Sequence, residues 1–186
     1  MRIVGGRLRG LRLADVGLGD EGARLRPTAD RVREAAFNLL VNGRGGDVVA
    51  GARVLDLFAG TGAMGLEALS RGAVAACFVE SGAVGLRLLR ENLRRARVEA
   101  RVVAGDATRL GACGEEGYGL VILDPPYGRG LGERALLAAV AGGWVAPGAT
   151  VLWEEAGPMA APAGFEGVDQ RRYGGTWLTV LRAEGP

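Results

Sequence analysis

The tetrad Asp124-Pro125-Pro126-Tyr127 contains residue types that suit chemistry on an amino group. It follows the apolar run 120–123, which is typical of the end of a buried strand. The two prolines fix φ near about −65° and remove two backbone donors, so the segment is rigid and presents hydrogen-bond acceptors. The exocyclic amine of a nucleic-acid base is a poor nucleophile because its lone pair is delocalised into the ring. Acceptors on its N–H groups, here the Asp124 carboxylate and the Pro125 carbonyl, would aim that lone pair at an incoming methyl group and stabilise the developing positive charge.

Tyr127 offers an aromatic face on which such a base can stack, a contact worth about 1–3 kcal/mol. No strong base is needed, because the proton can leave the amine after the methyl group has transferred. The plainer interpretation is a turn that closes a strand, with Tyr127 as a cap on the surface. The pairing with a second motif 60 to 70 residues upstream favours the catalytic interpretation.

That second motif is the glycine-rich segment 56–62, which follows the predicted strand 53–57 and opens a predicted helix near 62–71. Glycines at the carboxyl end of a parallel strand let the backbone approach a ligand closely. Gly60, Gly62 and Gly65 also spell G-x-G-x-x-G, with Glu80 twenty residues after the first glycine. This is the fingerprint of dinucleotide binding, so the segment by itself fits a nicotinamide enzyme, a methyltransferase or merely a tight turn.

The carboxylate of Asp56, four residues before Gly60, favours a methyltransferase. It would repel a pyrophosphate but suits a cation such as the methionine part of S-adenosylmethionine. The chain has no histidine, and all 23 basic residues are arginine, which excludes histidine-based general-base catalysis and Schiff-base chemistry. Glu80 is placed to accept the ribose hydroxyls. Asp106 is placed to reach the adenine amine, although a lone aspartate before a loop is commonly a turn or cap residue.

The predicted binding site for S-adenosylmethionine combines the glycine segment with the ends of the next two strands. It comprises Asp56, Phe58, Ala59, Gly60, Thr61, Gly62, Glu80, Ser81, Asp106 and Ala107.

Length and composition indicate one α/β domain of 186 residues with a sizeable core, since 48% of residues are hydrophobic and 24% charged. Only Cys77 and Cys113 are present, far apart, so we expect neither a zinc site nor a disulfide framework, and no metal. No apolar run approaches the ~18 residues of a membrane span, and the N-terminus lacks a signal peptide. A cytoplasmic protein without membrane contact is expected.

The order of predicted elements indicates a mostly parallel sheet with helices on both faces, because strands and helices alternate. Two short strands are expected in residues 1–13 and a helix after Thr28, ahead of the regular part. The remaining predicted strands are 53–57, 74–79, 100–104, 120–123, 149–154 and a closing hairpin at 164–182, and the predicted helices are 62–71, 82–97 and 132–142.

Arginines are concentrated in two segments, although the net charge is only +2. Residues 1–12 contain no acid, and we expect this arm to contact the phosphate backbone of a nucleic acid. The segment 87–101 carries six arginines against two glutamates, which fits a basic patch and a solvated surface equally well. The predicted RNA-contacting residues are Arg2, Arg7, Arg9, Arg12 and Arg26.

Several motifs together resemble the RsmD family, which are bacterial 16S ribosomal RNA guanine-N(2) methyltransferases. The similarity covers about residues 1–155 and is carried by Arg26-Pro27-Thr28 with Arg31, Arg33-Glu34 and Phe37-Asn38, then 55–62, Gly65-Leu66-Glu67-Ala68, Ser70-Arg71-Gly72-Ala73 and the tetrad at 124–127. The tetrad alone is shared with methyltransferases of adenine and cytosine amines, which remain an alternative, in DNA or RNA. A non-catalytic RNA-binding module is a further one.

The resemblance implies a Rossmann-like class I methyltransferase: a seven-stranded, mostly parallel sheet with its last strand antiparallel. It implies a small N-terminal β-hairpin extension at 1–25 that contacts RNA, and a methyltransferase domain at 26–186. It also implies S-adenosylmethionine at the site above and a flipped guanine at 124–127, an arrangement that costs a few kcal/mol of unstacking. The implied substrate is 16S rRNA in an assembled small ribosomal subunit. No functional residues are carried over to 156–186.

Overall fold

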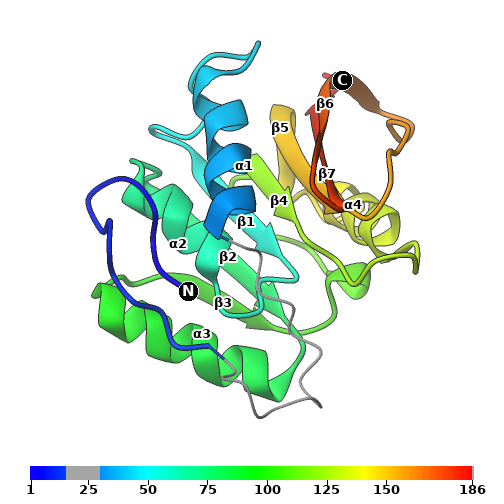
Figure 1. Cartoon of the computed structure of the whole chain (residues 1–186). Helices are drawn as coiled ribbons and strands as arrows, with labels where there is room; N and C mark the ends of the chain where they lie inside the picture. The colour runs from blue at the N-terminus through cyan, green and yellow to red at the C-terminus, as the bar shows by residue number, and fades with distance from the viewer. Residues whose placement is uncertain (16–29, 186) are drawn as a thin grey trace.

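The sheet is the central element of the computed structural model, which describes residues 1–15 and 30–185 (Figure 1). Within these residues seven strands follow the order β3-β2-β1-β4-β5-β7-β6. Neighbours from β3 through β5 are parallel, whereas β7 is antiparallel to both β5 and β6. The predicted class I fold, with its antiparallel last strand, is therefore confirmed.

The elements lie close to their predicted positions. The strands are β1 (Arg53–Leu57), β2 (Ala75–Glu80), β3 (Arg101–Ala104), β4 (Tyr118–Leu123), β5 (Val145–Glu155), β6 (Phe165–Tyr173) and β7 (Thr176–Ala183), and the helices are α1 (Asp30–Asn42), α2 (Ala63–Ser70), α3 (Ala83–Ala96), α4 (Leu131–Ala141) and the 3-10 turn η3 (Ala107–Arg109). No helix among the described residues is long and apolar enough to cross a membrane.

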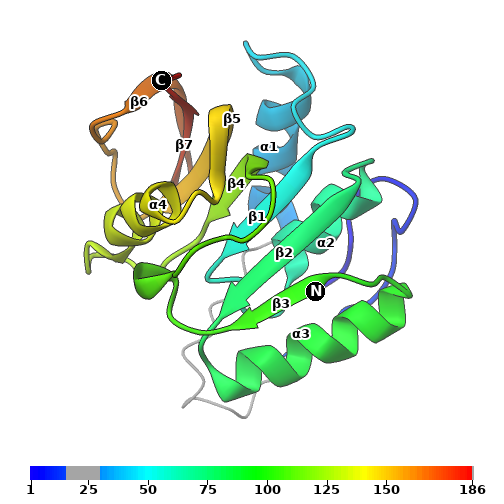
Figure 2. The ribbon, with the colours of Figure 1, turned by 180° about the vertical axis from the view of Figure 1, so that it is seen from behind.

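Alternate residues of each strand supply two cores, one on each face of the sheet. Val54 of β1 packs with α1, α2 and α3, whereas Leu55 and Leu57 pack with α4 and the segment around η3. Figure 2 shows α4 on the face opposite to α1. Because β1, β2 and β4 are covered on both faces, they read in sequence as nearly continuous apolar runs.

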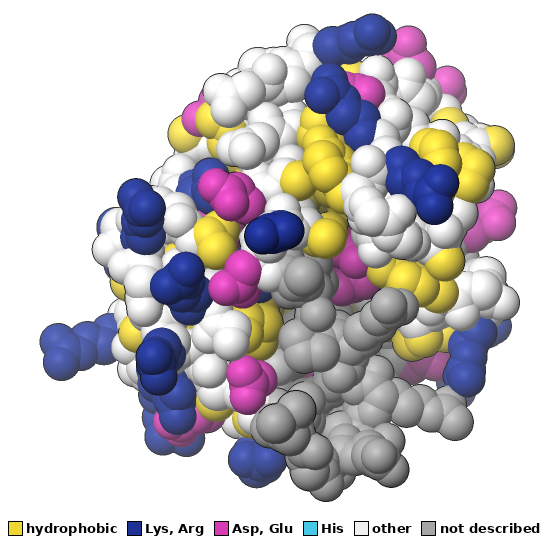
Figure 3. All heavy atoms as spheres, viewed as in Figure 1, with side chains coloured by type: hydrophobic (Ala, Val, Ile, Leu, Met, Phe, Trp, Pro, Cys, Tyr) yellow, Lys and Arg dark blue, Asp and Glu magenta, His cyan; other side chains and the backbone are white. Residues whose placement is uncertain are grey.

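The N-terminal segment 1–15 has no full strand where two were predicted, but residues 1–3 pair antiparallel with residues 11–13: the Ile3 amide donates to the Leu11 carbonyl at 3.0 Å, and the Leu13 amide donates to the Met1 carbonyl at 3.2 Å. It contains one antiparallel bridge, between Arg2 and Arg12. Other backbone donors of the segment bond α2: the amides of Val4 and Gly5 donate to the Glu67 carboxylate, both at 2.8 Å. The segment thus covers α2, all eight of whose residues are buried. On this face of the molecule, basic and acidic side chains are interspersed (Figure 3).

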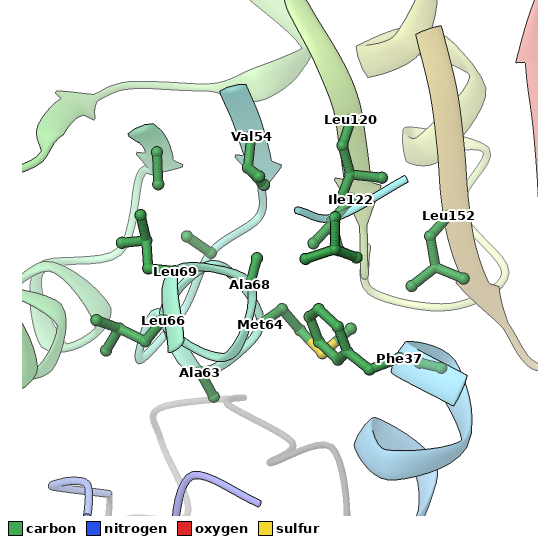
Figure 4. Close-up of a cluster of buried hydrophobic side chains, with 14 of the residues drawn as sticks. Phe37, Val54, Ala63, Met64, Leu66, Ala68, Leu69, Leu120, Ile122 and Leu152 are labelled. Atoms are coloured by element: carbon green, nitrogen blue, oxygen red, sulfur yellow. The ribbon is translucent and has the colours of Figure 1, made fainter. Parts of the chain in front are cut away.

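Packing between α1, α2 and the sheet fixes the helix that opens the site. Figure 4 shows Phe37 of α1 next to Met64 of α2, facing Ile122 of β4. Phe37 is fully buried, so its truncation to alanine would cost about 3–5 kcal/mol. The predicted helix start at Thr28, the Arg26-Pro27-Thr28 motif and the boundary at 25/26 lie outside the described residues.

Candidate active site

The glycine loop lies between β1 and α2 in a backbone conformation that favours glycine. Gly60 and Gly62 have φ of 54° and 78°. A Cβ on Gly65 would lie 2.4 Å from the Phe78 ring, so this glycine also lets α2 pack closely against β2. Phe58 has φ of 61°, a left-handed conformation that costs a bulky residue about 1–3 kcal/mol. The strained residue comes immediately after β1, where a ligand would bind.

Two carboxylates face this loop from neighbouring strands. Asp56 is 2% exposed and accepts a hydrogen bond from the Gly65 amide at 2.8 Å. Burial raises the pKa of Asp56 to about 7; the hydrogen bond from Gly65 opposes this, and the charge of Glu80 adds to it. Glu80 accepts from the amides of Gly60 at 2.7 Å and Gly82 at 2.6 Å, which joins the loops after β1 and β2.

This charge pattern fits a cationic ligand with hydroxyl groups. Residues 54–70 contain no arginine or lysine, so the loop offers no side-chain cation to a pyrophosphate. A buried carboxyl with a raised pKa is stabilised in its ionised form when a positive charge binds beside it. Both observations match the ammonium and sulfonium of S-adenosylmethionine.

The end of β3 adds Asp106 to the same edge of the sheet. The Gly105 amide donates to the Glu80 carbonyl at 3.0 Å, which brings the ends of β2 and β3 together. Asp106 is the N-cap of η3: its Oδ1 accepts from the amide and the hydroxyl of Thr108, both at 2.8 Å, and these bonds lower its pKa. The cap role weighed from sequence is confirmed, and Ala107 behind it is buried. A contact of Asp106 or of the exposed Ser81 with cofactor stays a prediction.

The Asp-Pro-Pro-Tyr tetrad follows β4, directly beside the glycine loop. Leu57 of β1 pairs with Leu123 of β4, so Phe58 and Asp124 both come immediately after this pair. Asp124 is partly exposed and Pro125 is buried, while Pro126 is exposed. Tyr127 is half-buried, and its hydroxyl donates to Glu154 Oε1 at 2.7 Å and lies 3.4 Å from Thr176 Oγ1. The fold therefore joins the two motifs at one edge of the sheet.

Comparison with known proteins assigns the chain to a family. The family model described as "Conserved hypothetical protein 95" matches residues 1–182. Ribosomal RNA small subunit methyltransferase D of Escherichia coli (strain K12) is 38% identical over 169 residues, which cover 89% of this chain and 81% of the relative. The chain belongs to this family. The resemblance to the RsmD family is thereby confirmed, and the nicotinamide-dependent oxidoreductase considered above is excluded.

Solved structures agree with this assignment. The E. coli protein "Putative methyltransferase yhhF" superimposes with a TM-score of 0.82 at 34% identity, over 100% of this chain and 99% of the other. The Thermus thermophilus 16S rRNA N2 G1207 methyltransferase (RsmC), solved with AdoMet and guanosine, has a TM-score of 0.59 at 20% identity, over 89% of this chain and 45% of the other. At that identity it shows a shared fold. This RsmD-family chain is a methyltransferase of the class I fold.

Three residues that contact the candidate site of this RsmD-family chain were not identified from the sequence: Asn92, Glu154 and Thr176. Asn92 of α3 is fully buried; its amide donates to the Thr61 carbonyl at 2.9 Å, and its Oδ1 accepts from the Ala14 amide at 2.6 Å. It therefore ties the glycine loop to the N-terminal segment. The sequence signal was available, since an asparagine stands on the apolar face of the helix at 82–97, between buried leucines. Glu154 likewise ends the otherwise apolar strand predicted at 149–154.

Buried charges attach the N-terminal arm to the methyltransferase core. Arg33 of α1 and Glu67 of α2 are both fully buried, with Arg33 Nε 3.5 Å from Glu67 Oε2. Arg33 also donates to the Arg2 carbonyl and to Asp30 Oδ1, while Arg71 Nε lies 2.7 Å from Glu67 Oε1. The sequence marked Arg33 and Glu67 only as parts of family motifs. Their structural role is to hold residues 2–5 against α1 and α2.

The predicted RNA-contacting arginines of the arm are exposed, and contact with RNA stays a prediction. Arg2, Arg9 and Arg31 line a groove of about 420 Å³ between the arm and α1, together with Asp30 and Glu34. The side chains of Arg7 and Arg12 are also exposed, and Arg26 lies outside the described residues.

The second arginine run, 87–101, is partly neutralised. Arg94 and Arg95 pair with Glu91 at 2.5 and 2.9 Å, and Arg101 pairs with Glu115. These pairs favour a solvated surface over a basic patch in this segment.

Proposed function

We propose that this RsmD-family protein transfers a methyl group from S-adenosylmethionine to the exocyclic 2-amino group of a guanine in 16S rRNA. One observation carries the proposal: the tetrad after β4 lies beside the glycine loop after β1, whose flanking carboxylates suit a cationic cofactor. Acceptors for an amine and a site for a methyl donor thus meet at one edge of the sheet.

The cofactor would be held by residues of three consecutive strand ends. Asp56 would pair with its ammonium, Glu80 would accept its ribose hydroxyls, and Asp106 would accept from its adenine amine through the oxygen not used as a cap. The backbone of 58–62, with Ser81 and Ala107, would line the rest. When bound, S-adenosylmethionine supplies an electrophilic methyl group on a sulfonium centre.

The acceptor amine would be held by the tetrad. The Asp124 carboxylate and the Pro125 carbonyl accept from its two N–H groups and leave the lone pair directed at the methyl group. Hydrogen bonds to charged groups contribute about 1.5–3 kcal/mol each, and this contribution grows as the amine becomes positive. The rigid Pro125-Pro126 pair keeps both acceptors in place before the base arrives. The proton leaves after transfer, so no histidine or lysine is required.

The RNA substrate is supported by the relatives, whose names describe small-subunit rRNA methyltransferases. We expect the substrate to be the assembled small subunit, reached with the help of the exposed arginine arm, and the enzyme to act in the cytoplasm where that particle is found. Adenine or cytosine amines remain the second candidate, since the tetrad fits any exocyclic amine.

The test uses tritiated S-adenosylmethionine with 30S particles from a strain that lacks the enzyme, followed by nucleoside analysis. We expect label in N(2)-methylguanosine, with more transfer to particles than to naked 16S rRNA. Asp124→Ala should abolish transfer and leave cofactor binding nearly intact, with Glu133→Gln on the exposed start of α4 as the matched control. Label in another nucleoside would refute the acceptor assignment, and full turnover by Asp124→Ala would refute the role of the tetrad.

A further inference from the structure

We infer that Glu154 and Thr176 are positioning residues, which hold the Tyr127 ring in the orientation that the acceptor base stacks on. This gives the β6–β7 hairpin, through Thr176 at its turn, a part in the acceptor site. The inference rests on the proposed function, because it concerns how the same site receives its base.

The contacts come from three different strand ends. Tyr127 follows β4, Glu154 is the penultimate residue of β5, and Thr176 opens β7. The Tyr127 hydroxyl lies 2.7 Å from Glu154 Oε1 and 3.4 Å from Thr176 Oγ1. The antiparallel register explains why they meet: Glu154 pairs with Leu178 and Glu155 with Trp177, so Thr176 stands next along β7, just past the end of β5.

The direction of these hydrogen bonds decides what Tyr127 can do. A phenol has a single proton, and the Tyr127 hydroxyl donates it to Glu154 Oε1. The Thr176 hydroxyl can then donate to a lone pair of the Tyr127 oxygen. Burial raises the pKa of Tyr127, the Thr176 bond opposes this, and Glu154 adds to it. The hydroxyl is therefore neither a base for the substrate amine nor a donor to the acceptor base.

What remains for the substrate is the ring itself, and it is fixed at both ends. The rigid Pro125-Pro126 pair precedes its backbone, and Glu154 holds its tip. Glu154 is 5% exposed, and a carboxylate buried to this degree is costly unless it is hydrogen-bonded. A side chain of two torsions held at both ends presents its face without further ordering when a base arrives.

The test compares variants in single-turnover methyl transfer to 30S particles, with cofactor affinity and melting temperature measured on each. Tyr127→Phe removes only the hydroxyl, Glu154→Leu removes the acceptor, and Glu154→Gln keeps an oxygen that can accept the same proton. Glu155→Gln is the matched control, since Glu155 is adjacent on β5 and its carboxylate accepts only from the neighbouring amide of Ala156 among the contacts described.

We expect Tyr127→Phe and Glu154→Leu each to slow transfer about tenfold with unchanged cofactor affinity, as expected for loss of preorganised geometry. The double variant should be no slower than Tyr127→Phe alone, because loss of the hydroxyl already breaks its bond to Glu154. Glu154→Gln should keep most of the rate. A purely structural role of Glu154 would lower the melting temperature without this pattern.

The inference is overturned if the two single effects multiply to about a hundredfold in the double variant, or if Glu154→Gln is as slow as Glu154→Leu. Should Glu154→Leu fail to fold, Tyr127→Phe still decides, because an undiminished rate in that variant overturns the inference. Failure of the proposed function is separate: the wild-type enzyme would then label no N(2)-methylguanosine, whatever the ratios among variants.

Discussion

Replacing Asp56 by asparagine tests whether burial of this carboxyl in the cofactor site lowers the free energy of unfolding. Burial raises the pKa of this carboxyl from 3.8 to about 7 in the folded protein. Between these values the unfolded chain has released the proton and the folded protein has not, so the free energy of unfolding falls as pH rises. Above about pH 7 both states are ionised and the cost is constant.

The magnitude follows from the interval between the two pKa values. At about 1.36 kcal/mol per pKa unit, 3.8 to about 7 corresponds to about 4 kcal/mol at full ionisation. Asparagine keeps an oxygen that can accept from the Gly65 amide but has no charge to bury. Between about pH 5 and about pH 8 the stability of Asp56→Asn relative to wild type should therefore rise by about 3 kcal/mol. Any fixed cost of burying the new amide cancels in this difference.

Urea unfolding followed by tryptophan fluorescence at both pH values measures the difference, with the exposed Glu133→Gln as the control. The same variant should lose the thermal stabilisation that S-adenosylmethionine gives the wild type, because it lacks the anion for the ammonium. If the stability of Asp56→Asn relative to wild type is the same at both pH values, the carboxyl is not held neutral by burial and the reasoning fails.

Three further predictions concern the scaffold and the arm. Gly65→Ala should lower stability by about 1–3 kcal/mol and weaken cofactor binding, since its Cβ would lie 2.4 Å from the Phe78 ring; an unchanged melting temperature would contradict this. Glu67→Gln should cost about 3–5 kcal/mol in urea unfolding because it removes the buried anion that Arg33 and Arg71 share and leaves Arg33 with Asp30 as its remaining carboxylate, whereas exposed Glu34→Gln should be near neutral. The third prediction concerns the arm arginines Arg2, Arg7, Arg9 and Arg12. Replacing them by alanine should raise KM for 30S particles and reduce the salt dependence of KM, with kcat unchanged. An unaltered salt dependence would argue against phosphate contacts.

Local sequence was sufficient for most of the framework. The alternation of apolar runs and amphipathic segments predicted the positions of the strands and helices, because the spacing of buried residues within a short segment differs between strands and helices. The residue types in the glycine loop and in the tetrad likewise indicated the chemistry of these two segments, because φ preference, charge and rigidity are properties of the individual residues. The two strands predicted at the N-terminus are reduced to a single antiparallel bridge between Arg2 and Arg12. Residues 1–13 have a strand-like pattern, but the amides of Val4 and Gly5 bond a carboxylate more than 60 residues away.

Tertiary structure decided which side chains meet. Glu154 lies 27 residues after Tyr127 in the sequence, and Thr176 lies 49 residues after it. Only the sheet order β4-β5-β7 brings the three residues together. The raised pKa of Asp56 likewise depends on the burial of its side chain under α2, and the residues around Asp56 in the sequence do not predict this burial. The sequence determines the chemistry each residue can perform because that is a property of the side chain. The partners that direct this chemistry are set by long-range packing, so they became visible only in the folded chain.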